Sequence, residues 1–286
     1  MTHLALIGGS GLYDLPLEDA AWREVDTPWG RPSDAILTGR LDGLPVSFLP
    51  RHGRGHRIAP SEIPARANIA ALKMLGATDV LSISAVGSFR EGMAPGHLVV
   101  VDGTLDRTYG RPASFFGTGC VAHVSLAQPV CPRLSDLAAR AAEAAGATVH
   151  RGGTYLCIEG PQFSSRFESR LWRSLGCDVV GMTMLPEARL AREAELCYAT
   201  VAMVTDYDSW HEAEAAVDVA AVLAVLRANA ARGRDLALGL PSRLGAGDHP
   251  CPHRCDRALD GAIITAPEAR DPDLVARLRP VAGRVL

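Results

Sequence analysis

The chain has 286 residues, 48% of them hydrophobic, and a formal net charge of −3. This length is enough for one large hydrophobic core or two small ones. Basic residues are not in excess, which argues against a nucleic-acid partner. No apolar run approaches the roughly 18 residues that a membrane span needs, and the N-terminus has no basic region typical of a signal peptide. We therefore expect a cytoplasmic protein with no membrane partner.

The first half of the chain alternates short apolar runs with one helical pattern. Strands are predicted over residues 3–8, 35–38, 46–49, 80–85 and 98–101, and a helix over 64–76. The first strand enters a glycine-rich loop, and the next two are expected to form a hairpin around Asp42 and Gly43. The helix has a proline near its start and a glycine at its end.

The second half repeats this alternation. Helices are predicted over residues 133–146, 164–176, 186–195 and 217–238, and strands over 154–158, 179–180 and 196–204. Glu168 follows the serines that open the second of these helices, as in a capping box. The alternation predicts an α/β fold, a single domain with a central mixed β-sheet flanked by helices. We expect residues 1–240 to form this domain. Residues 241–286 are expected to form an irregular C-terminal arm that is part of the same domain or closes a subunit interface.

Seven cysteines lie in apolar context, and their number is odd. In a cytosolic chain this pattern indicates buried small hydrophobic residues rather than a disulfide framework. Cys251 and Cys255, with His249 and His253 beside them, form the one cluster that suggests a metal. Their spacing is not the usual Cys-x-x-Cys, and no second ligand pair follows downstream. We therefore expect a tail loop and no metal site.

A glycine-rich loop, residues 7–11, follows the first predicted strand. Its glycines would let the backbone approach an anion, and the Ser10 hydroxyl can donate to phosphate oxygens. A plain tight turn is an equally good interpretation of this loop alone. A dinucleotide fingerprint is disfavoured, because Asp14 stands where the third glycine is needed and Pro16 follows where a helix should begin.

Two further strand ends carry residues suited to an anion. Arg51 and His52 directly follow an apolar strand, and a guanidinium binds phosphate bidentately while an imidazole adds a donor. Alone, this segment fits a solvated charge run better. Ser84 and Ala85 belong to a run of small residues that leaves another strand. Small side chains at the carboxyl end of a strand suit a ligand crevice in an α/β sheet.

Asp206 and Asp208 follow an apolar strand with only Tyr207 between them. Residues two apart on an extended backbone face the same way, so both carboxyl groups can point into one pocket. Because neighbouring carboxylates repel, one of them is expected to hold a proton near neutral pH. One donor and one acceptor match adenine, at N7 and the 6-amino group. A solvated or capping role is as common for such a turn.

Taken together and in this order, these stretches resemble the trimeric purine-nucleoside phosphorylases, and within that family the branch that acts on methylthioadenosine. The motifs that carry the resemblance are IGGSGLYD, RHGRGHRIAPSEIPARANIAALKMLGA, SAVGSFREGMAPGHLVVVD, IEGPQFSSRFES, GMTMLPEARLAREAELCYA and TDYDSW. They run from Leu4 to the region of Leu238. The resemblance implies phosphorolysis of S-methyl-5′-thioadenosine to adenine and 5-methylthioribose-1-phosphate, with inorganic phosphate as co-substrate and no cofactor.

The resemblance also implies roles for residues at matching positions. Those for phosphate are Ser10, Arg51, His52, Ser84 and Thr183. Those for the ribose are Ala85 and Met182, those for the purine are Asp206, Asp208 and Ser164, and those for the 5′ substituent are Val219 and Val222. His123 would reach the pocket of a neighbouring subunit, which implies a homotrimer or a hexamer. Asp206 is expected to be the protonated acid that donates to N7.

Two features bear on which base and sugar are accepted. Relatives that act on 6-oxopurines typically place asparagine at the position of Asp206, so the two aspartates indicate a 6-amino purine. The apolar Val219 and Val222 suit a thioether, because they would leave a 5′-hydroxyl unsatisfied at a cost of about 1–3 kcal/mol. Gly181 is a departure, since many enzymes of this branch have asparagine there and the 6-oxopurine relatives have glycine.

Three other functions fit parts of the pattern. A phosphorylase of the same fold could use another 5′-deoxyadenosine or prefer 6-oxopurine nucleosides such as inosine. A hydrolytic nucleosidase would cleave the same bond without phosphate, which the phosphate positions argue against. A non-enzymatic dinucleotide-binding module predicts G-x-G-x-x-G before a helix, and this sequence has neither feature.

Overall fold

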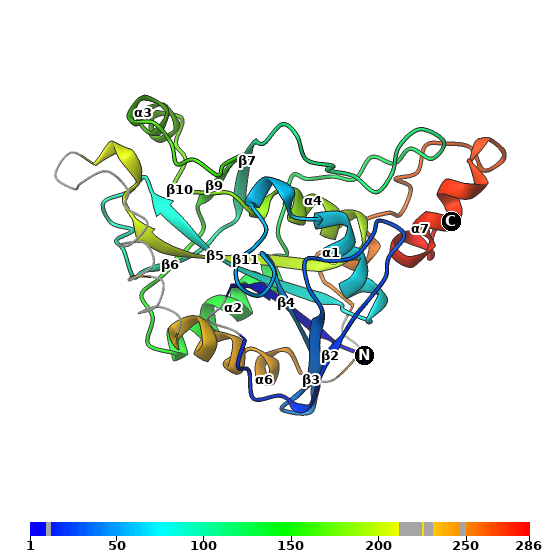
Figure 1. The fold of residues 1–286 in the computed structure, drawn as a ribbon, viewed down its shortest axis with the longest axis horizontal. Helices are drawn as coiled ribbons and strands as arrows, with labels where there is room; N and C mark the ends of the chain where they lie inside the picture. Colours follow the sequence, from blue (N-terminus) through cyan, green and yellow to red (C-terminus); the bar gives the residue numbers. More distant parts are fainter. Residues whose placement is uncertain (10–12, 212–224, 226–230, 246, 248–249) are drawn as a thin grey trace.

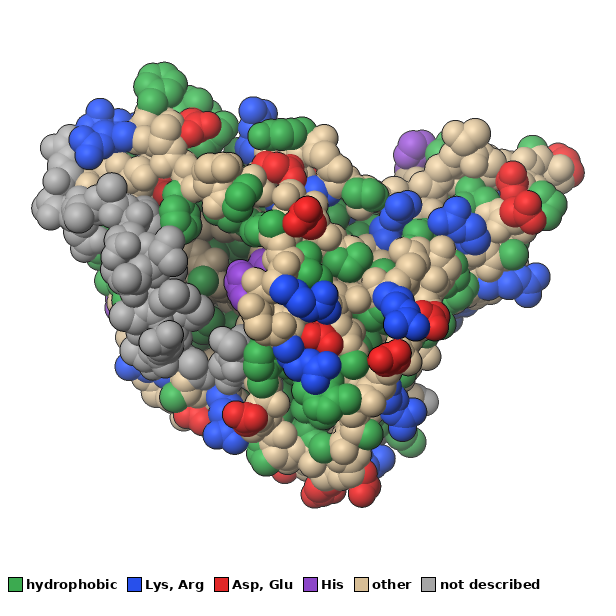
Figure 2. Space-filling model, viewed as in Figure 1, with side chains coloured by type: hydrophobic (Ala, Val, Ile, Leu, Met, Phe, Trp, Pro, Cys, Tyr) green, Lys and Arg blue, Asp and Glu red, His purple; other side chains and the backbone are tan. Residues whose placement is uncertain are grey.

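The computed structural model describes residues 1–286 except 10–12, 212–224, 226–230, 246 and 248–249 (Figure 1). Within the described residues, eleven strands form one mixed sheet with helices on both of its faces. The predicted fold class is therefore confirmed. On the face drawn in Figure 2, acidic and basic side chains are interspersed rather than segregated.

The strands have the following bounds in chain order: β1 (Leu4–Gly8), β2 (Glu18–Arg23), β3 (Ile36–Leu41), β4 (Leu44–Pro50), β5 (Asp79–Ser88), β6 (Leu98–Val100), β7 (Gly103–Arg107), β8 (Val149–Arg151), β9 (Thr154–Ile158), β10 (Val179–Gly181) and β11 (Cys197–Asp206). The named helices are α1 (Ala65–Met74), α2 (Pro132–Ala144), α3 (Arg166–Ser174), α4 (Met184–Glu193), α6 (Pro241–Leu244) and α7 (Pro272–Ala282). Residues 231–239 are also helical, whereas most of the long helix predicted over 217–238 lies outside the described residues.

Local sequence signals explain several of these boundaries. The turn between β3 and β4 has positive φ at both Asp42 and Gly43, the conformation of a tight hairpin turn. Helix α3 begins with the predicted capping box, because Ser165 and Glu168 each accept a hydrogen bond from the other's backbone N–H. Three strands escaped prediction: β2, β7 and β8, which are exposed or only partly buried. Their side chains lack the apolar pattern on which the prediction depends.

Strand β5 is the branching point of the sheet. Along one edge it pairs in parallel with β11 over nearly its whole length. Along the other edge it pairs first with β1, as far as Ser82, and then in antiparallel fashion with β10, from Gly87 onward. Between those two points the strand neighbours diverge. Ligands in α/β proteins bind at such a switch, beside the carboxyl ends of the strands.

Two apolar layers sandwich the sheet, and the alternation of side chains along the strands supplies both. In β1, Ala5 and Ile7 join one core cluster while Leu4 and Leu6 join the other. Helices α1 and α4 cover the first face, and α2 with residues 231–239 covers the second. Within the described part of the chain, no helix is long and apolar enough to cross a membrane.

The C-terminal arm is more ordered than the sequence predicted. It contains α7, whose N-cap Asp271 accepts hydrogen bonds from two backbone N–H groups, so the expectation of an irregular arm was wrong for this segment. Residues 262–264 pair with residues 121–123 through an isolated bridge and flanking backbone hydrogen bonds. Together these two segments form the projection on the right of Figures 1 and 2.

Candidate active site

Arg51, His52 and Ser84 lie where β1 and β4 end beside the middle of β5. Gly8 is the partner of Pro50 at the ends of β1 and β4, and the N–H of Arg51 donates to the carbonyl of Gly8 at 3.0 Å. This register carries Arg51 across the divergence beside β5. Its Nη1 donates to the Ile83 carbonyl at 2.9 Å, at the level where β1 no longer pairs with β5.

Arg51 and Glu187 form a buried ion pair at the centre of this region. Their side chains are 2% and 1% exposed, and Nε lies 2.6 Å from Oε1. Nη2 donates to the Ser82 hydroxyl at 2.6 Å, and the Tyr198 hydroxyl donates to Glu187 at 3.2 Å. Burial lowers the pKa of Arg51, but the adjacent Glu187 carboxylate more than offsets this effect, so the guanidinium stays charged.

His52 lies beside Arg51 and is held as a neutral imidazole. Its ring stacks on His56 with centroids 4.2 Å apart, and its Nδ1 lies 2.9 Å from the Ile58 carbonyl oxygen. Burial lowers the pKa of His52 to about 4. A neutral ring that donates from Nδ1 to a carbonyl has an unprotonated Nε2. His52 therefore offers an acceptor, where the sequence analysis expected a donor.

Three buried hydroxyl groups face one another next to this pair: those of Ser84, Tyr155 and Thr183. Burial raises the pKa of Tyr155, while the nearby hydroxyls of Ser84 and Thr183 lower it. Within the described residues, none of the three makes a hydrogen bond of normal geometry. Thr183 is the N-cap residue of α4, yet its side chain caps no helix amide. Buried hydroxyls without partners are costly, which marks this cluster as a place for a polar ligand.

The predicted acid pair lies at and just beyond the end of β11, the strand that runs parallel to β5. Asp206 is paired with Gly87 of β5, and Ser84 is three residues before Gly87. That separation corresponds to about 10 Å along a strand. Oδ1 of Asp206 accepts from the Thr205 hydroxyl at 2.7 Å, and Oδ2 accepts from the N–H of Asp208 at 2.9 Å.

Asp208 is the more buried acid, and it lies among serines. Burial raises the pKa of Asp208 to about 6, against the hydroxyls of Ser169 and Ser164, which lower it; the charge of Asp206 raises it further. A proton-binding carboxyl in the pair was predicted, but on Asp206. The ligand-free geometry favours the proton on Asp208, because both oxygens of Asp206 accept hydrogen bonds that stabilise an ionised carboxylate.

The remaining predicted residues of the pocket divide into two groups. Ser164 is buried beside Asp208, and its carbonyl accepts from the Ser209 hydroxyl at 2.8 Å. Ala85 is half-buried and follows Ser84 on β5. Met182 follows β10, and its carbonyl accepts from Arg111, whose guanidinium also binds the carbonyls of Ile158 and Leu185. The structure thus brings Ser164 to the acid pair, and Ala85 and Met182 to the strands that flank it.

Of the four remaining predicted residues, the structure describes only His123. Ser10, Val219 and Val222 lie outside the described residues. His123 is exposed on the projecting segment, and its N–H donates to the carbonyl of Ala262 in the C-terminal arm at 2.9 Å.

The structure explains why glycine stands at position 181, which the sequence alone did not. A side chain at this position would overlap the hydroxyl of Tyr155, and it would also press on Val86. Tyr155 is fully buried, so it cannot turn away. The glycine is therefore required by the tyrosine on the neighbouring strand, β9, and does not by itself indicate a 6-oxopurine.

Glu187, Tyr155 and Arg111 are site residues that the sequence analysis missed. Glu187 had a detectable signal, since it lies on an otherwise apolar helical face, where a carboxylate needs a buried partner. Tyr155 lies in an ordinary apolar strand and carries no such signal. Arg111 acts on backbone carbonyls, and such contacts leave no trace in the pattern of side chains.

A polar cluster beside Ser84 and an acid pair beside Gly87, joined by the small residues of β5, are what a nucleoside and an anion need. The chain belongs to the phosphorylase superfamily, whose family model matches residues 3–240. The most similar relatives that we compared share one named activity within this superfamily. An S-methyl-5′-thioadenosine phosphorylase of Cereibacter sphaeroides is 63% identical, over 100% of this chain and 99% of that relative. One from Bradyrhizobium diazoefficiens is 56% identical, over 99% of this chain and 98% of that relative.

Solved structures agree with these relatives. A methylthioadenosine phosphorylase from an Antarctic soil metagenomic library superposes with a TM-score of 0.92 at 43% identity, covering 98% of each chain. A methylthioadenosine phosphorylase from Schistosoma mansoni, in complex with adenine, superposes with a TM-score of 0.83 at 38% identity, over 87% of this chain and 93% of that one. The predicted family resemblance is confirmed.

The contact between Gly181 and Tyr155 is testable by a double-mutant cycle. We expect Gly181→Ala to destabilise the fold by about 1–3 kcal/mol, because the added methyl group overpacks against the tyrosine. Tyr155→Val removes the ring and leaves room for that methyl group. Urea unfolding of the two single variants and the double variant measures the coupling. The double variant should be less destabilised than the sum of the singles, and additive losses would contradict the assignment.

Because the pKa of Asp208 is raised in the folded protein, its contribution to the free energy of unfolding depends on pH. The pKa rises from 3.8 to about 6, so ionised Asp208 opposes folding by up to about 3 kcal/mol above pH 6. Asp208→Asn should therefore stabilise the protein at pH 7 to 8. The gain should shrink as the pH falls through 6 and vanish below about pH 3, where the wild-type carboxyl is protonated in both the folded and the unfolded state. Thermal unfolding across this pH range checks the prediction, and a gain independent of pH would contradict it.

Proposed function

We propose that this chain catalyses the phosphorolysis of S-methyl-5′-thioadenosine, which makes it a pentosyltransferase of the purine nucleoside phosphorylase type. The observation that carries the proposal is the placement of the Asp206–Asp208 pair about 10 Å along β5 from the cluster of Arg51, His52 and Ser84. The names of the close relatives support the same reaction. The products are adenine and 5-methylthioribose-1-phosphate. Inorganic phosphate is the co-substrate, and the reaction uses no organic cofactor.

The acid pair recognises a 6-amino purine because it holds one proton between two carboxyl groups. Burial raises the pKa of Asp208 to about 6, so in the free enzyme this carboxyl binds a proton mainly below pH 6. Asp206 is only half-buried before substrate binds, and coverage by the purine favours its protonated form. We assign Asp206 as the acid that donates to N7, and Asp208 as the acceptor from the 6-amino group. The C1′–N9 bonding electrons then leave with adenine, which departs protonated at N7.

The phosphate is held beside Ser84, three residues before Gly87 on β5, and attacks C1′. The hydroxyls of Ser84 and Thr183 donate to its oxygens, and these are buried hydroxyls without other partners in the described chain. Arg51 supplies positive charge, which Glu187 holds in one orientation. The unprotonated Nε2 of neutral His52 accepts a hydrogen bond from the O–H of a monoprotonated phosphate, and the proton stays on the phosphate. The anion lies beneath C1′, stabilises the positive charge that develops on the ribose, and then forms the new C1′–O bond.

The assembly and the 5′ pocket complete the proposal. Val219 and Val222 line the 5′ substituent, and Ser10 joins the phosphate site, as the family resemblance implies. His123 is exposed on the segment that pairs with residues 262–264, and the family resemblance implies that it reaches a neighbouring subunit of a homotrimer. All seven cysteines are free and buried, consistent with the reducing cytoplasm.

A single assay tests the reaction and its main rivals. Release of free base is measured from methylthioadenosine, adenosine and inosine, each with and without phosphate. We expect adenine release that depends on phosphate and is fastest from methylthioadenosine. Faster release from inosine would mean that Asp206 and Asp208 bind a 6-oxopurine. Release of base without phosphate would make the enzyme a nucleosidase and would contradict the assignment of the phosphate-binding residues.

The role of Asp206 is tested by Asp206→Asn. Asparagine keeps the size of the side chain but cannot transfer a proton, so we expect kcat on methylthioadenosine to fall by roughly 10²–10⁴-fold. Asp19→Asn is a matched control, because Asp19 is exposed on β2 and should tolerate the change. Circular dichroism shows whether the fold is retained. A kcat near that of the wild type would exclude Asp206 as the acid.

A further inference from the structure

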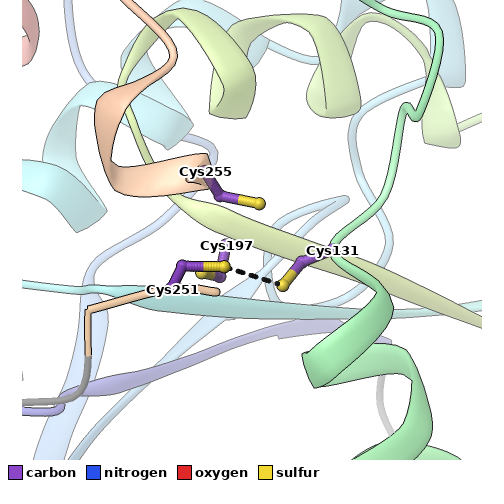
Figure 3. Close-up of side chains that lie close together, drawn as sticks. All are labelled: Cys131, Cys197, Cys251 and Cys255. Atoms are coloured by element: carbon purple, nitrogen blue, oxygen red, sulfur yellow. Dashed lines mark hydrogen bonds between the residues drawn. The ribbon is translucent and has the colours of Figure 1, made fainter. Parts of the chain in front are cut away.

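Four cysteines from three distant parts of the chain meet on the face of the sheet covered by α2 (Figure 3). They are Cys131, Cys197, Cys251 and Cys255. Their sulfur atoms all lie within 4.8 Å of one another, and all four side chains are buried. Cys131 is the N-cap residue of α2, Cys197 begins β11, and the other two belong to the C-terminal arm.

Backbone contacts hold each part in place. The N–H of Cys131 donates to the carbonyl of Tyr198 at 2.7 Å, and that of Cys197 donates to the carbonyl of Thr78 at 3.0 Å. In the arm, Arg254 adopts the left-handed conformation, with φ of 55°, and its N–H donates to the carbonyl of Cys251 at 2.8 Å. This turn brings the Cys255 side chain back towards Cys251. Four thiols therefore converge on one point from ordered backbone.

The spacing of the thiols fits a single tetrahedral ion. Zinc–sulfur bonds of about 2.3 Å place the sulfurs of a tetrahedral site about 3.8 Å apart. The sulfurs of Cys131 and Cys251 are 3.6 Å apart, whereas a disulfide bond would bring them to about 2.05 Å. We propose that Cys131, Cys197, Cys251 and Cys255 form a structural zinc site that fastens the C-terminal arm to the core. The sequence analysis expected no metal because it looked for a second ligand pair downstream of Cys251 and Cys255, whereas that pair lies upstream.

The surroundings suit the negative charge that four thiolates around a zinc ion carry. Arg133, in the first turn of α2, pairs with Asp79 and lies against Cys197; its Nε is buried without a hydrogen-bond partner among the described residues. The N-terminus of α2, where Cys131 lies, favours a negative charge as well.

The structure offers a path by which zinc can reach the four thiols, and it shows what the site would hold in place. A cavity of about 530 Å³ is lined by Cys197 and Cys251 together with Arg133 and Lys73, so an ion can reach the thiols from the surface. Beyond Cys255, the arm packs Leu259 into the core and pairs residues 262–264 with 121–123. Cys197 and Asp206 are the two ends of β11, about 30 Å apart, so the site acts on stability and not on the chemistry.

The metal content of the full-length protein tests the proposal. Protein purified without chelators or metal-affinity resin should contain about one zinc per chain by mass spectrometry of the elements. The double variant Cys251→Ser/Cys255→Ser should lose this zinc and unfold at a lower temperature. Cys177→Ser is the matched control, because Cys177 is equally buried but lies in a different cluster, and it should retain zinc. At low temperature the double variant should still release adenine, which separates this proposal from the proposed reaction.

A second measurement does not depend on how the variants fold. Wild-type protein produced in cobalt-supplemented, zinc-depleted medium should show the thiolate charge-transfer and intense visible bands of tetrahedral cobalt. Four outcomes would overturn the proposal: metal-free protein with all its thiols titratable, a disulfide among the four cysteines by peptide mapping, iron in place of zinc, or zinc retained by the double variant.

Discussion

The buried ion pair between Arg51 and Glu187 is the interaction on which the site depends. Two charges out of water are tolerated only when paired and hydrogen-bonded, and removing one partner of such a pair costs roughly 3–5 kcal/mol. Here the pair joins the loop after β4 to helix α4, and Arg51 also satisfies the carbonyl of Ile83 where β1 no longer pairs with β5. The guanidinium thus closes the gap in the sheet that creates the site. Arg51, which the sequence predicts for phosphate, therefore also joins two parts of the fold.

Strand β5 sets the distance between the two parts of the site. Its small residues leave space above the strand, and its register with β11 fixes how far the acid pair lies from the hydroxyls of Ser84 and Thr183. Gly87 is essential to this arrangement, since a side chain there would press on both Asp206 and Asp208. This spacing is set by the hydrogen bonds of the sheet and does not depend on a bound ligand. Pre-organisation of this kind lowers the cost of orienting nucleoside and phosphate.

Most of this could be predicted from the sequence, and the exceptions have physical reasons. Strand ends, helix caps and the two aspartates are local patterns, and the structure has them where the sequence indicated. The protonation states differ because they depend on burial: His52 is neutral chiefly because burial lowers its pKa to about 4, and the charges of Arg51 and His56 lower it further. Gly181 was read as a sign of base preference, whereas Tyr155, twenty-six residues earlier, explains it. Exposed strands such as β2 carry no apolar alternation and could not be seen.

The two ends of β11 show how the fold reconciles binding with stability. Its last residue, Asp206, belongs to an acid pair in which burial disfavours the ionised form of Asp208. Buried hydroxyl groups nearby have no hydrogen-bond partner among the described residues. Such groups make the free enzyme less stable than an apolar core would. Its first residue, Cys197, lies among the thiols that receive the C-terminal arm. The strand is buried along almost its entire length, so it is held firmly between these ends. Fastening the arm at the far end stabilises the sheet without adding constraints where the substrate must enter and leave.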